Sequence, residues 1–417
     1  MNEITTFWAE WLRPSAGLPT VQWSLLLAVA SLVGYLLRRY SGLPKVVGYS
    51  LVGTFAGLAG FNGALWPLQG IGLFLLELGM SIVLFEAGSR IPLRWFRHNP
   101  MVLVQSVAES ALTYYAVYWT LHALLDVPTG VASPLALVAL AASPAVLGRV
   151  VADTRAAGPV TDRALVLATL SSLYALALGS ARAELLNRPQ ITLMDTIYPV
   201  AVVLGVSVVV GALLALALRL ALRVMSPASE NTAMLLIALV AAGTAVAAHL
   251  GGSAPLAALL GGMLLKQLNP RPWAWPRQLG SASSLLTMLM FVLVSTVAAQ
   301  ADWTGPVAGT VAALILVRVA AKAVGVGLGN IGSGASWRQA LWVSGAMSPM
   351  SSIALLIASQ FVAASPSLGP QIAQVALPAI LLMEMLGAVV ATVAIYRAGE
   401  SSRPWTPQPL AAGDTPP

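Results

Sequence analysis

The chain has 417 residues, of which 58% are hydrophobic and only 9% are charged. Soluble domains carry about 25% charged residues, so this composition excludes a water-soluble globular protein and favours an integral membrane protein. The net charge of +7 would suit nucleic acid only if the basic residues clustered on one soluble face, whereas here they are spread over short polar stretches.

Apolar runs recur along nearly the whole chain, each of roughly 20 residues, which is enough to cross a hydrocarbon core of about 30 Å. They predict an all-α polytopic membrane protein with about thirteen transmembrane helices. The expected spans are 20–37, 46–60, 68–88, 101–125, 131–151, 160–181, 196–218, 232–249, 253–266, 282–301, 304–328, 338–360 and 371–396.

The basic residues between these spans predict the orientation, because short cytoplasmic loops hold the excess of Lys and Arg. Of the 22 Lys and Arg, Arg318 and Lys322 lie inside a span, only Arg13, Arg182 and Arg188 fall in one set of alternate loops, and all others fall on the opposite side. We therefore expect an external N-terminal segment (1–19), a transmembrane domain (20–398) and a disordered, proline-rich cytoplasmic tail (399–417). The expected location is the bacterial inner membrane.

Two predicted spans carry a Ser-Pro pair near their middle: Ser143-Pro144 in the fifth and Ser348-Pro349 in the twelfth. Proline interrupts the hydrogen bonding of a helix, and a tolerated kink is the simplest reading of each. The two spans are an odd number apart, so they run in opposite directions, as in inverted repeats whose discontinuous helices form a binding site. We predict helix breaks at Pro144 and Pro349, with freed carbonyls and amides exposed to a substrate.

Four segments have a familiar pattern: Leu43-Pro44-Lys45-Val46-Val47-Gly48-Tyr49, Glu77-Leu78-Gly79 with residues 84–88, residues 252–262, and Ser336-Trp337-Arg338-Gln339-Ala340-Leu341 leading to Ser348-Pro349. Together they resemble the second, third, ninth and twelfth helices of the monovalent cation/proton antiporter superfamily, which has a membrane domain of the sodium/proton exchanger type. The resemblance implies a homodimer with a panel of packed helices beside a core. In that core, the fifth and twelfth spans would be crossed, discontinuous helices where a monovalent cation and a proton compete for carboxylates.

The resemblance also implies an aspartate in the sixth span, but the matching place holds Ser171 and Ser172. At the two breaks, too, this sequence lacks the acidic residues that family members carry there. Hydroxyls can ligate a hard cation but do not titrate near neutral pH. The candidate ion-binding residues are Ser143, Ser171, Ser172, Ser348, Ser351 and Ser352. The alternative for each is a hydrogen bond to its own helix or packing at a helix interface.

Charged groups inside a membrane are costly and usually mark function. The charge-coupling candidates are Lys322, Arg318, Glu77 and Glu109. Arg318 and Lys322 are four residues apart and share a helix face; Lys322 matches the family's basic residue and, without the aspartate, needs another partner. Alternatively, the two cations hold helices together through Glu109, Glu384 or free carbonyls. Glu86 is expected to pair with Arg90 or Arg94.

The sequence predicts a secondary transporter that exchanges Na⁺ or K⁺ for protons with altered coupling residues. A carrier or channel of the same fold for an anionic or neutral solute, without proton coupling, is one alternative, and a transport-inactive membrane regulator is another. Cysteine is absent and the three histidines are scattered, so we expect no metal site and no cofactor. The sequence shows no recognisable arrangement of a nucleophile, a base and oxyanion donors, so we expect that the protein is not an enzyme.

Overall fold

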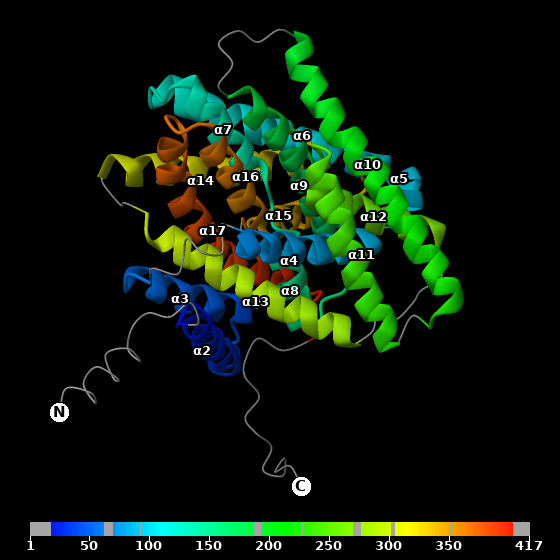
Figure 1. Ribbon diagram of the computed structural model, residues 1–417. Coiled ribbons are helices and arrows are strands. Elements are labelled where there is room, and N and C mark those ends of the chain that lie inside the picture. Colours follow the sequence, from blue (N-terminus) through cyan, green and yellow to red (C-terminus); the bar gives the residue numbers. More distant parts are fainter. Residues whose placement is uncertain are drawn as a thin grey trace, which may run out of the picture.

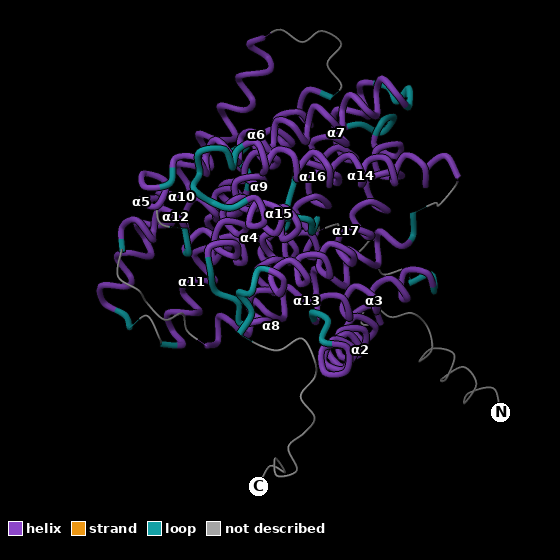
Figure 2. Tube along the Cα trace, turned by 180° about the vertical axis from the view of Figure 1, so that it is seen from behind, coloured by secondary structure: helices purple, strands orange, loops and turns teal. Residues whose placement is uncertain are grey.

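The computed structural model describes residues 18–61, 70–91, 93–186, 193–226, 229–269, 277–301, 305–350 and 352–402. All regular structure in these ranges is helical, and Figure 2 shows helices joined by short loops. The first half contains α2 (Leu18–Ser41), α3 (Lys45–Leu58), α4 (Gly70–Ser89), α5 (Leu93–His98), α6 (Pro100–Trp119), a π-helical turn (Thr120–Leu124), α7 (Thr129–Leu140), α8 (Pro144–Thr154) and α9 (Pro159–Leu185). The second half contains α10 (Leu193–Val224), α11 (Glu230–His249), α12 (Ala254–Leu268), α13 (Arg277–Ala299), α14 (Gly305–Leu328), α15 (Trp337–Ala346), α16 (Ser352–Ala364) and α17 (Gly369–Arg397).

Each predicted apolar span coincides with a helix, and the fifth and twelfth coincide with the pairs α7–α8 and α15–α16. Within the described ranges, 7 helical segments are long and apolar enough to cross a membrane, and shorter apolar helices such as α3, α12 and α16 accompany them. Helix α16 is short because it is one half of an interrupted span. The all-helical architecture is therefore as predicted, while the number of crossings and the orientation stay predictions.

The helices fall into two packed groups (Figure 1). One group, which we call the core bundle, consists of α6–α9 and α14–α17; among its closest pairs are α6 with α14, α7 with α9, and α16 with α17. The other, which we call the panel, consists of α2–α4 and α10–α13, with α4 against α12 and α3 against α13. Contacts of α17 with α3 and α13 join the two groups.

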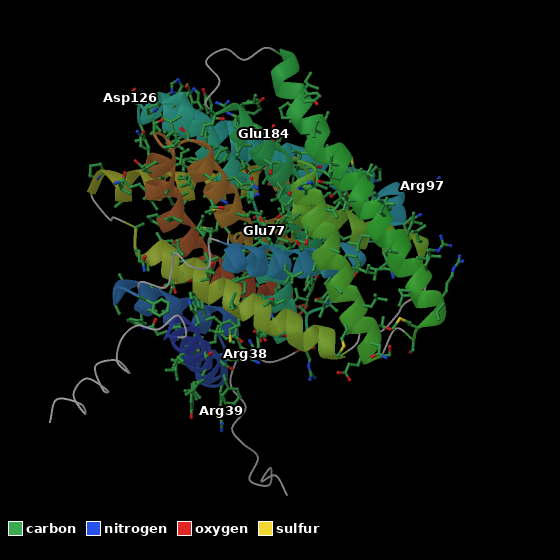
Figure 3. The ribbon with its side chains drawn as sticks, viewed as in Figure 1. Arg38, Arg39, Glu77, Arg97, Asp126 and Glu184 are labelled. Atoms are coloured by element: carbon green, nitrogen blue, oxygen red, sulfur yellow. The ribbon has the colours of Figure 1, made fainter. Side chains whose placement is uncertain are left out.

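Helix α6 carries the chain from one side of the molecule to the other. Figure 3 shows Arg97, which precedes this helix, and Asp126, which follows it, at opposite sides of the protein. Residues between them are thus distributed through the depth of the fold. Glu109 lies near the middle of α6 and is completely buried.

The end of the chain is attached to the start of α9. The Glu400 carboxylate accepts hydrogen bonds from the backbone amides of Val160 (2.8 Å) and Thr161 (2.7 Å), which are among the unpaired donors of the first turn. The Ser402 hydroxyl donates to the carbonyl of Arg155 at 2.8 Å. The predicted disordered tail (399–417) thus begins too early, because residues 400–402 are held by these bonds. Residues 403–417 and 1–17 lie outside the described residues.

We expect Glu400→Ala to lower the thermal stability of the purified protein, because losing a helix N-cap costs about 0.5–2 kcal/mol. The melting temperature in detergent measures this. The matched control is Glu184→Ala, which removes an exposed glutamate from the other end of the same helix. Equal melting temperatures for Glu400→Ala and Glu184→Ala would contradict the capping role.

Candidate functional site

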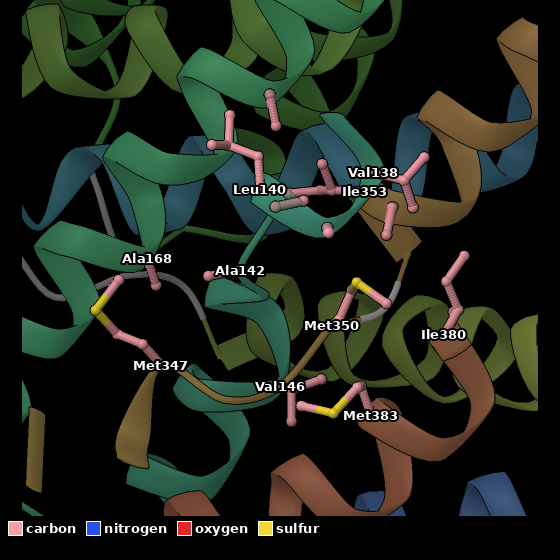
Figure 4. Close-up of a cluster of buried hydrophobic side chains, with 14 of the residues drawn as sticks. Val138, Leu140, Ala142, Val146, Ala168, Met347, Met350, Ile353, Ile380 and Met383 are labelled. Carbon is pink, nitrogen blue, oxygen red and sulfur yellow. The ribbon is translucent and has the colours of Figure 1, made fainter. Parts of the chain in front are cut away.

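The two predicted breaks exist and lie against each other. Helix α7 ends at Leu140 and α8 begins at Pro144, while α15 ends at Ala346 and α16 begins at Ser352. The backbone amide of Ser143 donates to the carbonyl of Pro349 at 3.0 Å, so the two interrupted segments are in direct contact. Figure 4 shows apolar side chains from both breaks packed around this meeting point, among them Val146 and Met350.

Arg318 binds the carbonyls that the breaks set free. This side chain is wholly buried on α14, and its Nε, Nη1 and Nη2 atoms each donate at 2.8 Å, to the carbonyls of Ala139, Ser348 and Ala141 respectively. A positive charge is favourable at a helix C-terminus such as that of α7. These three carbonyls are therefore already used, and the expectation that the breaks expose them to a substrate is wrong for these positions.

Lys322 finds its partner in Glu109. The Nζ atom of Lys322 on α14 lies 2.8 Å from Oε2 of Glu109 on α6, and both side chains are excluded from solvent. The hydroxyl of Ser171 on α9 donates to Oε1 of the same carboxylate and accepts a 3.3 Å hydrogen bond from Lys322. Three helices of the core bundle thus meet at one carboxylate, one ammonium and one hydroxyl.

This meeting point depends on close packing of α6 and α14. A Cβ atom added at Gly325 would overlap the Cα atom of Glu109, and one added at Gly329 would overlap Gln105. Small residues let membrane helices approach closely. Gly325 lies three residues after Lys322 and so shares its helix face, which brings the ammonium within reach of Glu109.

The six candidate serines do not act as one group. Ser143 caps α8 by accepting from the amide of Val146 at 3.3 Å, and Ser172 donates to the carbonyls of Ala142 (2.6 Å) and Ala168 (2.8 Å). The bond of Ser143 and that of Ser172 to Ala168 are the local backbone bonds of the alternative reading, whereas the bond of Ser172 to Ala142 joins α9 to the first break. Ser348 contributes its carbonyl to Arg318.

The remaining serines differ again. Ser352 is buried and its hydroxyl has no hydrogen-bond partner among the described residues. Ser351 lies outside the described residues. Ser171 is the one member of the set, within the described part, that bonds to an ionisable side chain.

The other candidate acids lie on the panel helix α4. Glu77 is partly buried (Figure 3) and makes no hydrogen bond or ion pair with the described residues. Glu86 pairs with Arg90 at 2.6 Å, in a partly exposed ion pair, as expected for a residue near the helix end. The structure therefore separates both from the Glu109 cluster.

One cavity lies beside the buried ion pair, and another lies beside the first break. A cavity of about 570 Å³ lies between α6, α7, α9 and α10, and its lining includes Ser110, Tyr174 and Arg182. The hydroxyl of Ser110 donates to Glu109 at 3.1 Å, so this cavity ends beside the buried ion pair. A second cavity of about 280 Å³ reaches Pro144 at the start of α8 and is lined by charged residues including Arg149.

Discontinuous helices around a buried ion pair, in a chain of apolar helices, define the membrane domain of a secondary transporter. The model of the family described as "Sodium/hydrogen exchanger, transmembrane" matches residues 27–397. The chain therefore belongs to the sodium/hydrogen exchanger family, a family of cation/proton antiporters, and is a multi-pass membrane protein.

Two solved structures of the sodium proton antiporter MjNhaP1 from Methanocaldococcus jannaschii are similar in fold. For the structure at pH 8 the TM-score is 0.69 at 16% identity, covering 91% of this chain and 98% of that one. For the electron-microscopy structure the TM-score is 0.75 at 16% identity, covering 94% and 100%. No curated protein matches the chain in sequence.

The sequence pointed to Lys322 but left its partner open. Glu109 was one of several candidate acids, because nothing local indicates that α6 packs on α14. Gly325 and Gly329 are the signal that could have helped, since they mark the face of α14 that bears Lys322 as a close-contact face.

We expect Gly325→Ala to destabilise the protein by about 1–3 kcal/mol, as overpacking does in a tight interface. Gly327→Ala is the matched control, because a Cβ atom there would meet only the ring of Trp337 at 3.6 Å, an ordinary contact. Thermal unfolding in detergent measures both. A Gly325→Ala variant as stable as Gly327→Ala would show that α6 and α14 do not need this close approach.

Proposed function

We propose that the protein exchanges a monovalent cation, Na⁺ or K⁺, for a proton, and that Glu109 is the coupling carboxylate. The observation that carries the proposal is the hydrogen bond from Ser171 to Glu109. Ser171 and Ser172 together occupy the place in the sixth span where the family resemblance implies an aspartate preceded by another polar residue. The carboxylate missing from α9 is thus supplied from α6, beside the same basic residue on α14.

Competition between the cation and a proton follows from charge balance. A buried carboxylate requires a compensating positive charge, and the ammonium of Lys322 provides it in the described conformation. A cation that binds Glu109 displaces this ammonium. A buried ammonium without a partner is less stable than the neutral amine, and it therefore gives up its proton. One cation bound therefore corresponds to one proton released.

Cavities beside Glu109 and beside the first break support alternating exposure. The 570 Å³ cavity ends at Ser110, next to Glu109, and the 280 Å³ cavity reaches Pro144 at the start of α8. Arg90 and Arg149 line the second cavity, and both lie on the side that the charge distribution assigns to the cytoplasm. A displacement of the core bundle along the panel would connect the site to each side in turn.

The surroundings of Arg318 and Lys322 favour a cation over an anionic solute. All three nitrogens of Arg318 donate to backbone carbonyls, and Lys322 is paired with a carboxylate. Neither group, as described, presents a free positive charge to an anion. A carrier for anions would need one of these bonds to break before its substrate could bind.

We expect a gradient of Na⁺ or K⁺ to drive proton movement in liposomes that contain the purified protein, and a Cl⁻ gradient to drive none. Glu109→Gln should reduce this flux to below about one tenth, because the neutral amide has no charge to balance a cation that displaces Lys322. Glu86→Gln should change little, since its partly exposed ion pair with Arg90 contributes about 0–1 kcal/mol. Flux driven by chloride would support the anion carrier. The absence of flux under every gradient would support the inactive regulator.

A double substitution separates transport from folding. Lys322→Ala alone should abolish exchange and cost about 3–5 kcal/mol of stability, because it leaves Glu109 as an uncompensated buried charge. Replacing both partners, by Glu109→Gln with Lys322→Met, should restore most of the melting temperature without restoring cation-driven proton flux. Normal flux in the stable double variant would remove the ion pair from the mechanism.

A further inference from the structure

A second buried acid, Glu384 on α17, lies outside the site described above. Its side chain is completely buried. The hydroxyl of Ser50 on α3 donates to Oε1 at 2.5 Å, and the hydroxyl of Ser295 on α13 donates to the same oxygen at 3.0 Å. Glu384 is therefore held by two panel helices, although it belongs to a helix of the core bundle.

Helices α3 and α13 act as one support for these two hydroxyls. A Cβ atom added at Gly53 of α3 would overlap the carbonyl of Val292 on α13 and come within 3.0 Å of the Cβ atom of Ser295. So close a contact leaves the two helices little freedom to move independently. Ser50 and Ser295 should move together as part of the panel.

Helix α17, in contrast, follows the breaks. Gly387 lies three residues after Glu384, and a Cβ atom there would overlap the backbone of Pro349. Residues three apart lie on neighbouring positions of one helix face. The same face of α17 thus contacts the α15–α16 break and presents Glu384 to the panel. Any displacement of the core bundle relative to α3 and α13 must lengthen or break the bonds of Glu384.

The partners at Oε1 suit a group that changes its protonation state. Both are neutral hydroxyls, each of which can donate to a carboxylate or accept from a carboxylic acid by rotating its hydrogen. Ionisable residues on α17 and on the helices packed against it, within the described part, are Lys45, Tyr49, Arg149, Asp153, Arg277, Arg318, Lys322, Arg338, Tyr396 and Arg397. Of these, Arg318 and Lys322 are engaged at other groups.

We propose that Glu384, with Ser50 and Ser295, is a second proton-binding site, which opens to water on either side when the core bundle moves against the panel. The carboxylate takes a proton from water on one side of the membrane, forming an O–H bond, and releases it to water on the other side as that bond breaks. No other reactant is required. This inference rests on the proposed antiport and adds one proton to each transport cycle.

Two measurements on Glu384→Gln test the site. In liposomes, the proton-to-cation ratio, obtained from the pair of pH and cation gradients at which flux reverses, should fall by about one proton per cation while exchange persists. In detergent, infrared difference spectra between acidic and alkaline pH should lose the carbonyl band of one titrating carboxylic acid. Ser295→Ala should keep the infrared band but shift its pH midpoint, because the carboxyl keeps its proton and loses one donor. Glu86→Gln is the matched control and should leave the ratio at the wild-type value.

The outcomes distinguish this proposal from the antiport proposal. An unchanged ratio, or an infrared band that persists in Glu384→Gln, overturns the second proton site, as does complete loss of exchange in a folded Glu384→Gln protein. If the wild type shows no cation-driven proton flux, the antiport proposal fails and the second site fails as a transport step. The infrared band still decides whether Glu384 binds a proton.

Discussion

Burial of charge in an apolar interior constrains this structure more than any other interaction. Glu109 and Lys322 compensate one another across α6 and α14, at a depth where either alone would be prohibitive. The pair requires the helices to approach closely, which explains the glycine at 325. It also aligns Ser171 with the carboxylate, so α9 is oriented by the same contact. A substrate cation would have to replace a positive charge that the fold itself needs.

Arg318 compensates a second unfavourable burial, that of backbone carbonyls without hydrogen-bond donors. Interrupting two helices inside an apolar bundle leaves backbone carbonyls without partners, and each would cost several kcal/mol in a membrane interior. One guanidinium supplies three donors to carbonyls from both breaks. Arg318 and Lys322, one helical turn apart, therefore have different tasks: the first stabilises the interrupted backbone, and the second balances the carboxylate that we propose as the cation site.

The parts of this architecture that depend on local sequence were predictable. Apolar length located the helices, and Ser-Pro pairs located both breaks, because proline acts on its own helix. The site was harder to predict from the sequence, since Lys322 and Glu109 are 213 residues apart and their pairing is decided by how α6 packs on α14. The serine cluster shows the same limit. Their positions at the two breaks and in the sixth span drew attention to six hydroxyls. Backbone groups already bind Ser143 and Ser172, however, and only the packed fold reveals that Ser171 contacts an acid.

The attachment of Glu400 to the start of α9 bears on how the protein is synthesised. The carboxylate that caps this helix is 240 and 239 positions downstream of the two amides that it binds. While the ribosome is still making the second half, α9 must enter the membrane with its first turn unpaired, relying on water or lipid headgroups for hydrogen bonds. Synthesis of Glu400 then supplies a partner for the two amides. A nascent chain stopped before Glu400 would contain every helix described above and still lack these two bonds.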